Sequence, residues 1–228
     1  MKIAILGAGN VGGALGKLWS SQGHDIVFGV RDPQSAKVEA TLAQVGTTVA
    51  VTSVAEAVAF GDLVLLAVPW QAVPGVLQEA GDWTGKILLD ATNRMAPGGP
   101  GQMPSAGEDV ARWAQGAKVV KGFNTTGSGN MDGRPYGSHK VEILLCGDDT
   151  DAKATVARLV EASGFDAVDA GPLANAGLTE AMAGLWVQLA YRLGNGPNIM
   201  FKLHKRESCD TSYLARAACA SPSWPWAP

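Results

Sequence analysis

Cysteine and histidine are both scarce in this sequence, with three of each among 228 residues. The cysteines, Cys146, Cys209 and Cys219, are odd in number, lie far apart and form no C-x-x-C pair. The sequence therefore supports neither a disulfide framework nor a zinc site, and it fits a reducing compartment. No histidine lies in a recognisable nucleophile or metal motif, so we expect no metal and no catalytic acid, base or nucleophile.

Long apolar runs and basic runs are also missing. The longest apolar segment, Leu63–Val68, is far too short to cross a bilayer, and the N-terminus begins a strand at once instead of a signal peptide. The 18 Lys and Arg side chains are outnumbered by 21 Asp and Glu, which gives a net charge of −3 without a basic patch. We therefore expect a cytoplasmic protein that binds small molecules, with no nucleic acid or membrane partner.

The sequence does contain, near its start, a glycine-rich turn between an apolar strand and an amphipathic helix. The run Ile3-Ala4-Ile5-Leu6 precedes Gly7-Ala8-Gly9-Asn10-Val11-Gly12, and apolar residues then recur with helical spacing until Gly23. Three glycines at this spacing allow a tight turn, close approach of the backbone to a pyrophosphate, and close packing of helix on strand. Such a segment can be only a turn, but its context predicts the first βαβ unit of a dinucleotide-binding domain, with the phosphates at the helix N-terminus.

The end of the second expected strand, 24–29, bears on the choice of nucleotide. About 20 residues beyond the glycines, NAD-binding units place an acidic side chain on the ribose 2′-hydroxyl. This chain has Val30 and then Arg31 there, and a guanidinium suits a 2′-phosphate. The sequence thus favours NADP over NAD, with Lys37 as a second phosphate contact. In the alternative, Arg31 is a solvated loop residue and Asp32 binds the ribose.

Three further strands end in residues suited to line a ligand crevice. They are 62–68, followed by Pro69 and Trp70; 85–90, followed by Thr92 and Asn93; and 118–121, whose glycine-rich sequel contains Asn124 and Thr125. We expect the strand over 62–68 to lie beside the first strand, on the side opposite the second. Its end then faces the switch point where open α/β sheets bind ligands. Trp70 can equally be a core aromatic, and 122–130 a plain surface loop.

The alternation of strands and helices predicts an α/β fold, a doubly wound and mostly parallel Rossmann sheet with a smaller C-terminal α/β lobe. Capping boxes at Ser53 and Ser105, each followed three residues later by Glu, predict two helix starts. We divide the chain into an NADP-binding domain, a C-terminal lobe and an irregular tail, over residues 1–125, 126–205 and 206–228. A long helix over 178–193 has an apolar side wide enough for its own core and a dimer partner.

Six motifs of this chain resemble those of the NADPH:F420 oxidoreductases, including their bacterial relatives and the cytosolic domain of the STEAP metalloreductases. The motifs are Gly7–Gly12, Val68-Pro69-Trp70, Asp90-Ala91-Thr92-Asn93, Phe123-Asn124-Thr125, Cys146-Gly147-Asp148-Asp149 and Asp169-Ala170-Gly171-Pro172-Leu173. The resemblance spans roughly residues 1–203 and leaves the tail uncovered. It implies a small homodimeric enzyme in which a hydride passes directly between NADPH and a flavin-like second cofactor, face to face in the crevice.

Two positions depart from the archaeal F420 enzymes. Those enzymes carry Ser-Arg where this chain has Val30-Arg31, so one phosphate contact is missing, and they carry His where this chain has Asn124, beside the deazaflavin. Asn124-Thr125 looks more like the STEAP domain and the bacterial relatives, which leaves the second cofactor open between F420 and a flavin, FAD or FMN. Two other functions stay open: an NADPH-binding sensor without turnover, and a small-substrate reductase akin to pyrroline-5-carboxylate reductase. The cofactor-binding residues expected are Gly7, Ala8, Gly9, Asn10, Val11, Gly12, Val30, Arg31, Lys37, Val68, Pro69, Trp70, Thr92, Asn93, Asn124 and Thr125.

Overall fold

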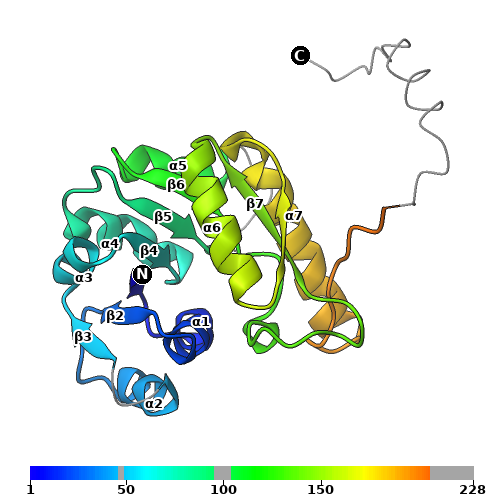
Figure 1. The fold of residues 1–228 in the computed structure, drawn as a ribbon, viewed down its shortest axis with the longest axis horizontal. Helices are drawn as coiled ribbons and strands as arrows, with labels where there is room; N and C mark the ends of the chain where they lie inside the picture. Colours follow the sequence, from blue (N-terminus) through cyan, green and yellow to red (C-terminus); the bar gives the residue numbers. More distant parts are fainter. Residues whose placement is uncertain (46–48, 95–103, 206–228) are drawn as a thin grey trace, which may run out of the picture.

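The computed structural model describes residues 1–45, 49–94 and 104–205, which form one eight-stranded sheet flanked by helices (Figure 1). The strands are β1 (Lys2–Leu6), β2 (Asp25–Gly29), β3 (Ala50–Thr52), β4 (Leu63–Leu66), β5 (Ile87–Asp90), β6 (Lys118–Lys121), β7 (Glu142–Gly147) and β8 (Asp166–Asp169). The helices are α1 (Asn10–Ser21), α2 (Ala36–Val45), α3 (Val54–Phe60), α4 (Val73–Ala80), α5 (Ala106–Trp113), α6 (Thr150–Ala162) and α7 (Ala176–Val187). Four short helical segments are η1 (Trp70–Ala72), η2 (Ser128–Asn130), η3 (Leu173–Asn175) and η4 (Gln188–Arg192).

The strand order β3-β2-β1-β4-β5-β6-β7-β8 confirms the doubly wound, mostly parallel sheet that the sequence predicts. β4 lies beside β1 on the side opposite β2, as expected, so the switch point falls between β1 and β4. Among the strands of the described sheet, only β6 and β7 pair antiparallel, and they do so through two residues of each strand, Val120 with Gly147 and Lys121 with Cys146. The first four residues of β7 therefore extend beyond the end of β6.

Two hydrophobic cores lie on opposite faces of the sheet because successive side chains of a strand point to opposite sides. Ile3 and Ile5 of β1 pack in the core that α1, α2 and α6 cover. Ala4 and Leu6 pack in the other core, under α3, α4 and α5. Burial on both faces accounts for the almost unbroken apolar runs of β1 and β4.

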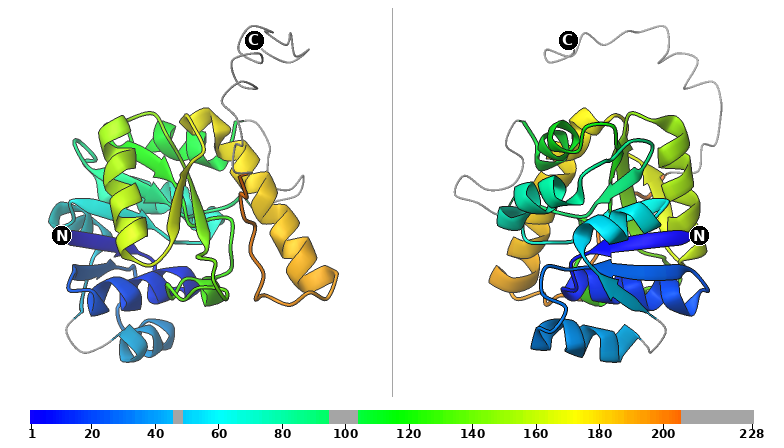
Figure 2. Two further views of the ribbon diagram at one scale, coloured as in Figure 1. Left: turned by 45° about the vertical axis from the view of Figure 1, so that its right-hand side comes forward. Right: turned by 90° about the vertical axis from the view of Figure 1, so that its left-hand side faces the viewer.

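The smaller lobe predicted after residue 125 contains β7, α6, β8 and α7, and its strands continue the main sheet. An aromatic cluster also joins it to α1: the ring centroids of Trp19 and Phe123 are 6.0 Å apart, and those of Phe123 and Phe165 are 5.5 Å apart. Trp19 Nε1 donates to Ser163 Oγ at 2.9 Å. In Figure 2, α7 stands at one side of the molecule and the chain after η4 runs back along it, where Ile199 accepts a hydrogen bond from Trp186.

Local sequence signals predict the starts of helices better than the ends of helices and strands. Ser53 and Ser105 both form the capping boxes that the sequence predicts. The long helix expected over 178–193 is α7 followed by the π-helical turn η4, in which the N–H of Leu193 donates to the carbonyl of Gln188. The strand expected over 62–68 is shorter, Leu63–Leu66. Residues 46–48 and 95–103 lie outside the described ranges, as does the tail predicted over 206–228.

We expect Ser53→Ala to lower the free energy of unfolding by about 1 kcal/mol, because the exposed Ser53 hydroxyl accepts from the N–H of Glu56 at the start of α3. Urea denaturation followed by circular dichroism measures the change. Ser21→Ala is the control, since the hydroxyl of Ser21 bonds Leu18 at the far end of α1 and caps no helix start. A change of similar size in both variants would argue against the capping role.

Candidate functional site

The turn between β1 and α1 brings backbone segments so close together that only glycine fits. Gly7 has a φ of +106°, and a Cβ there would lie 2.6 Å from the carbonyl oxygen of Ala67, just after β4. A Cβ on Gly12 would lie 2.0 Å from the carbonyl oxygen of Gly7, because α1 packs directly against the turn. The glycines thus form a shallow cradle of bare backbone at the switch point of the sheet.

The first turn of α1 has N–H groups that no side chain caps, because its N-cap residue is Gly9. The helices α3 and α5 differ, since Ser53 and Ser105 accept from their first-turn N–H groups. The start of α1 therefore offers hydrogen-bond donors and the positive end of the helix dipole to an anion. This cradle, which a Cβ would fill, fits the pyrophosphate of a dinucleotide.

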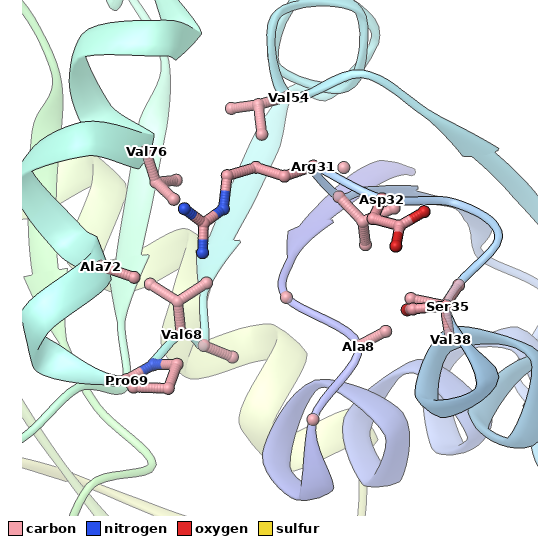
Figure 3. A pocket seen from close by; sticks show the side chains of 15 residues that line it. Ala8, Arg31, Asp32, Ser35, Val38, Val54, Val68, Pro69, Ala72 and Val76 are labelled. Atoms are coloured by element: carbon pink, nitrogen blue, oxygen red, sulfur yellow. The ribbon is translucent and has the colours of Figure 1, made fainter.

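A cavity of about 240 Å³ lies beside the turn, near the ends of β2 and β4 (Figure 3). Its polar side chains are those of Arg31, Asp32 and Ser35, which follow β2. In Figure 3, the guanidinium of Arg31 reaches toward Val76, whereas the carboxylate of Asp32 lies on the side of Ala8 and Ser35. Both the expected phosphate-binding residue and its alternative therefore line one cavity.

A second cavity, of about 370 Å³, adjoins the first at the end of β4. The two share four lining residues, Gly9, Ala67, Val68 and Pro69, so together they cross the switch point. From there the second cavity continues to the residues that follow β5, Ala91, Thr92 and Asn93. The described residues that line it include no acid, base or thiol side chain.

Most of the cofactor-binding residues expected from the sequence meet in these two cavities. They are Gly7, Ala8, Gly9, Val30, Arg31, Val68 and Pro69 in the first cavity, with Asn10, Val11, Trp70, Thr92 and Asn93 added by the second. Gly12 is buried behind the turn. Lys37 lies on α2, but its side chain is outside the described part of the structure.

Asn124 is tied to the second cavity through Asn93. Its Nδ2 donates to Asn93 Oδ1 at 3.2 Å and to Thr179 Oγ1 at 3.3 Å, while the amide of Asn93 donates to the Asn124 carbonyl oxygen at 2.9 Å. Phe123 has a φ of +57°, a left-handed conformation that is uncommon outside glycine, and it turns the chain between β6 and Asn124. Asn124 Oδ1 is buried and has no hydrogen-bond partner among the described residues.

Trp70 belongs both to the core and to the site. It packs on the core cluster of α4 and α5, with its ring centroid 5.5 Å from that of Trp113, and it lines the second cavity. The guanidinium of Arg94 lies 4.9 Å from the centroid of Trp70 and is held by Asp109. Sequence reasoning missed Arg94, although its place directly after Asn93 is a usable signal.

Thr125 lies in a third, mainly apolar cavity of about 370 Å³. Its walls come from the start of β7, from α7 and from the segment after η4: Thr126, Val141, Glu142, Leu144, Met182, Met200, Phe201, Lys202 and Leu203. The side chain of Glu142 accepts from the backbone N–H of Leu203 at 2.6 Å, which fastens that segment over the cavity. The residues that follow β5, Thr92 and Asn93, thus line the second cavity, whereas Thr125, which follows β6, lines the third.

The thiol of Cys146 lines none of these three cavities. Burial raises the pKa of the Cys146 thiol to about 11, so this side chain is protonated at neutral pH. Within 1–45, 49–94 and 104–205 there is no cluster of His, Cys, Asp and Glu able to hold a metal ion. None of the helices described there has the length and apolar character needed to span a bilayer.

Comparison with known proteins points to one family. Residues 2–94 match the family described as "NADP oxidoreductase coenzyme F420-dependent". The metalloreductase STEAP3 of Rattus norvegicus is 31% identical over 182 residues, which is 79% of this chain and 36% of STEAP3, so the chain spans about a third of that relative. A reductive aminase from Aspergillus terreus, solved with NADPH, is 24% identical with a TM-score of 0.62. The match covers 84% of this chain and 63% of the aminase, and at this identity it shows a shared fold alone.

A crystal structure of a protein from Arthrobacter sp. FB24 matches most of the chain. That protein is assigned as an F420-dependent NADP reductase, is 30% identical with a TM-score of 0.79, and the match covers 90% of this chain and 100% of the other. A hypothetical protein from Sinorhizobium meliloti is 27% identical with a TM-score of 0.66, over 90% and 96% of the two chains. This chain therefore belongs to the coenzyme F420-dependent NADP oxidoreductase family, a family of NADP-dependent oxidoreductases.

Proposed function

We propose that this protein transfers a hydride directly between NADPH and a deazaflavin, F420, or a flavin, FAD or FMN. The observation that carries the proposal is the pair of adjoining cavities that cross the switch point over the glycine cradle. Their combined path suits an extended dinucleotide, with its adenosine at Arg31 and its nicotinamide at Trp70 and Asn93.

The adenosine half is held by backbone and by one charged side chain. The N–H groups at the start of α1 hold the pyrophosphate, and the exposed guanidinium of Arg31 binds the 2′-phosphate, with Lys37 as a second contact. Val30 and Val68 line the apolar part of this cavity. Asp32, in the same cavity, is the alternative contact to the ribose hydroxyls.

At the other end, the chain orients a planar ring. When bound, NADPH supplies a hydride from its nicotinamide ring to the second ligand. Because hydride transfer depends on closeness and alignment, holding two rings about 3–3.5 Å apart accounts for much of the rate. The second cavity, with Pro69 and Trp70 as a firm wall and no titratable side chain among its described lining residues, fits this task.

The third cavity supports a second ligand next to the nicotinamide. Thr125 lines it, and the preceding residue, Asn124, is hydrogen-bonded to Asn93 at the second cavity. Its mainly apolar walls suit a ring system with few charges, and Met182 and Met200 adapt their shape to such a surface.

We further propose a cytoplasmic homodimer. Leu178 and Leu185 of α7 are 68% and 51% exposed, and their seven-residue spacing places them on one helical face. Tyr191 of η4 and Leu193, directly after η4, are 65% and 69% exposed and add to an apolar stripe at this end of the chain. A second copy of the chain would cover this apolar stripe.

Replacing Arg31 by Ala should weaken NADPH binding by about 1.5–3 kcal/mol, roughly 10- to 150-fold, and leave NADH binding nearly unchanged, because a charged hydrogen bond to the 2′-phosphate is lost. Isothermal titration calorimetry with both nucleotides gives the two affinities.

Two further variants sharpen this measurement. Arg158→Ala removes an exposed guanidinium from α6, whose Nη2 bonds Thr155, and should alter neither affinity. Asp32→Asn tests the alternative: a selective loss of NADH binding would mean that Asp32 holds the ribose and that Arg31 is solvated. Equal losses for both nucleotides in Arg31→Ala would remove the case for a phosphate contact.

Anaerobic mixtures of the protein with NADPH and F420, FMN or FAD should oxidise NADPH, followed at 340 nm, on the order of 1 per second or faster with the true acceptor. Tight NADPH binding with no turnover for any of the three would favour a nucleotide sensor instead. The absorption spectrum of a chromophore retained on purification would distinguish a flavin from F420.

The double variant Leu178→Glu, Leu185→Glu should convert a dimer into a monomer in sedimentation velocity, since two charges would be buried in the apolar contact. Ala154→Glu, which adds the same charge to the exposed side of α6, should keep the wild-type state. A wild-type protein that sediments as a monomer at micromolar concentration would contradict the proposed dimer.

A further inference from the structure

A fully buried lysine lies at the end of β6, between two carboxylates. Lys121 Nζ is 2.9 Å from Asp90 Oδ2 and 3.1 Å from Glu180 Oε1, and the three side chains are 0–1% exposed. The same ammonium donates to the carbonyl oxygen of Thr92 at 2.5 Å. Asp90 ends β5 and Glu180 lies on α7, so one cation connects two strand ends to a helix from the C-terminal lobe.

Glu180 extends this connection to the start of α5. Its carboxylate accepts from the backbone N–H groups of Ala106 and Gly107 at 3.0 and 3.1 Å. A Cβ on Gly107 would lie 2.9 Å from the Cβ of Ala176, so glycine permits this close approach of α5 and α7. The N–H groups of α5 thus supply the positive partner that two carboxylates sharing one ammonium still need.

The other end of the network holds the lip of the second cavity. Asp90 Oδ1 accepts from both the backbone N–H and the hydroxyl of Thr92, at 2.9 and 2.7 Å. Together with the bond from Lys121, these fix the peptide of Thr92 on both its N–H and C=O sides. Asn93 is held through Asn124, whose Nδ2 also reaches Thr179, the neighbour of Glu180 on α7.

Stability alone is a weak reason for such a network. Taking three charges out of water costs several kcal/mol each, and apolar side chains of similar volume often serve a core equally well. An ammonium group donates three directed hydrogen bonds, and these fix the positions of the groups that accept them. Here those groups are two carboxylates and the backbone of a cavity-lining residue.

We propose that Lys121 is a positioning residue: it holds Thr92 and Asn93 where the nicotinamide half of NADPH binds and couples that place to α7 through Glu180. The proposal rests on the proposed function, because it assigns the second cavity to the nicotinamide. Lys121 itself touches neither cavity, since it lines neither of them.

The test compares NADPH with adenosine 2′,5′-bisphosphate, which carries only the adenosine half, using the full chain with Lys121→Met. NADPH should bind about 10-fold or more weakly, because its nicotinamide end meets a displaced lip, and kcat should fall on the order of 100-fold. The bisphosphate should bind within about twofold of wild type, because its cavity keeps the glycine cradle and Arg31. A lysine that only stabilises the fold would leave the ratio of the two affinities unchanged.

Lys118→Met is the matched control, since Lys118 lies on the same strand and its ammonium pairs with Asp149 at 3.0 Å on a part-exposed surface. It should alter neither affinity. Glu180→Gln keeps the contacts of Lys121 with Asp90 and Thr92. It replaces Lys121→Met in the test if that variant does not fold. It should weaken NADPH at least threefold without changing bisphosphate binding, because the coupling to α7 is loosened.

The outcomes separate the two proposals. If wild type binds neither ligand, the proposed function fails, and the role of Lys121 fails with it. If wild type binds both ligands and oxidises NADPH, but the folded variants lose both affinities equally or lose neither, the proposed function stands and the positioning role is overturned.

Discussion

The fold depends on the close approach of three backbone segments: the turn after β1, the start of α1 and the chain just after β4. Gly7 must pass under the carbonyl of Ala67, and Gly12 must press α1 against the turn, before the ends of β1 and β4 can lie side by side with an open helix N-terminus between them. Any side chain larger than hydrogen at these positions would push α1 away from the sheet. The cradle is therefore a consequence of packing, and the same packing gives it the shape that fits a phosphate.

Patterns of short range in the sequence predicted much of the fold. The capping boxes at Ser53 and Ser105, the glycine turn and the apolar runs are local signals, and each produced the expected element. The order of β1, β2 and β4 followed from the rules for doubly wound sheets. Because the residues that follow each crevice strand lie at one end of the sheet, most residues that line the two adjoining cavities could also be named in advance.

Contacts between distant residues could not be read in the same way. The ion pair of Lys121 and Asp90 joins neighbouring strands whose residues are 31 positions apart, and Glu180 comes from α7, far along the chain. Each of these residues reads alone as an ordinary solvated charge. Arg94 is similar: only the folded structure places its guanidinium against the ring of Trp70. Buried polar networks depend on the topology of the whole fold, and no local pattern of residues in the sequence predicts them.

The overhang of β7 beyond β6 has a consequence for how such proteins diversify. Because only two residue pairs join these strands, the first part of β7 pairs with β8 and not with β6, and it forms a wall of the cavity beside Thr125. Lengthening or trimming the connection at 126–141 would reshape that cavity while the glycine cradle stayed intact. The scaffold is in this sense modular, because the shape of the cavity beside Thr125 can change independently of the packing that forms the glycine cradle.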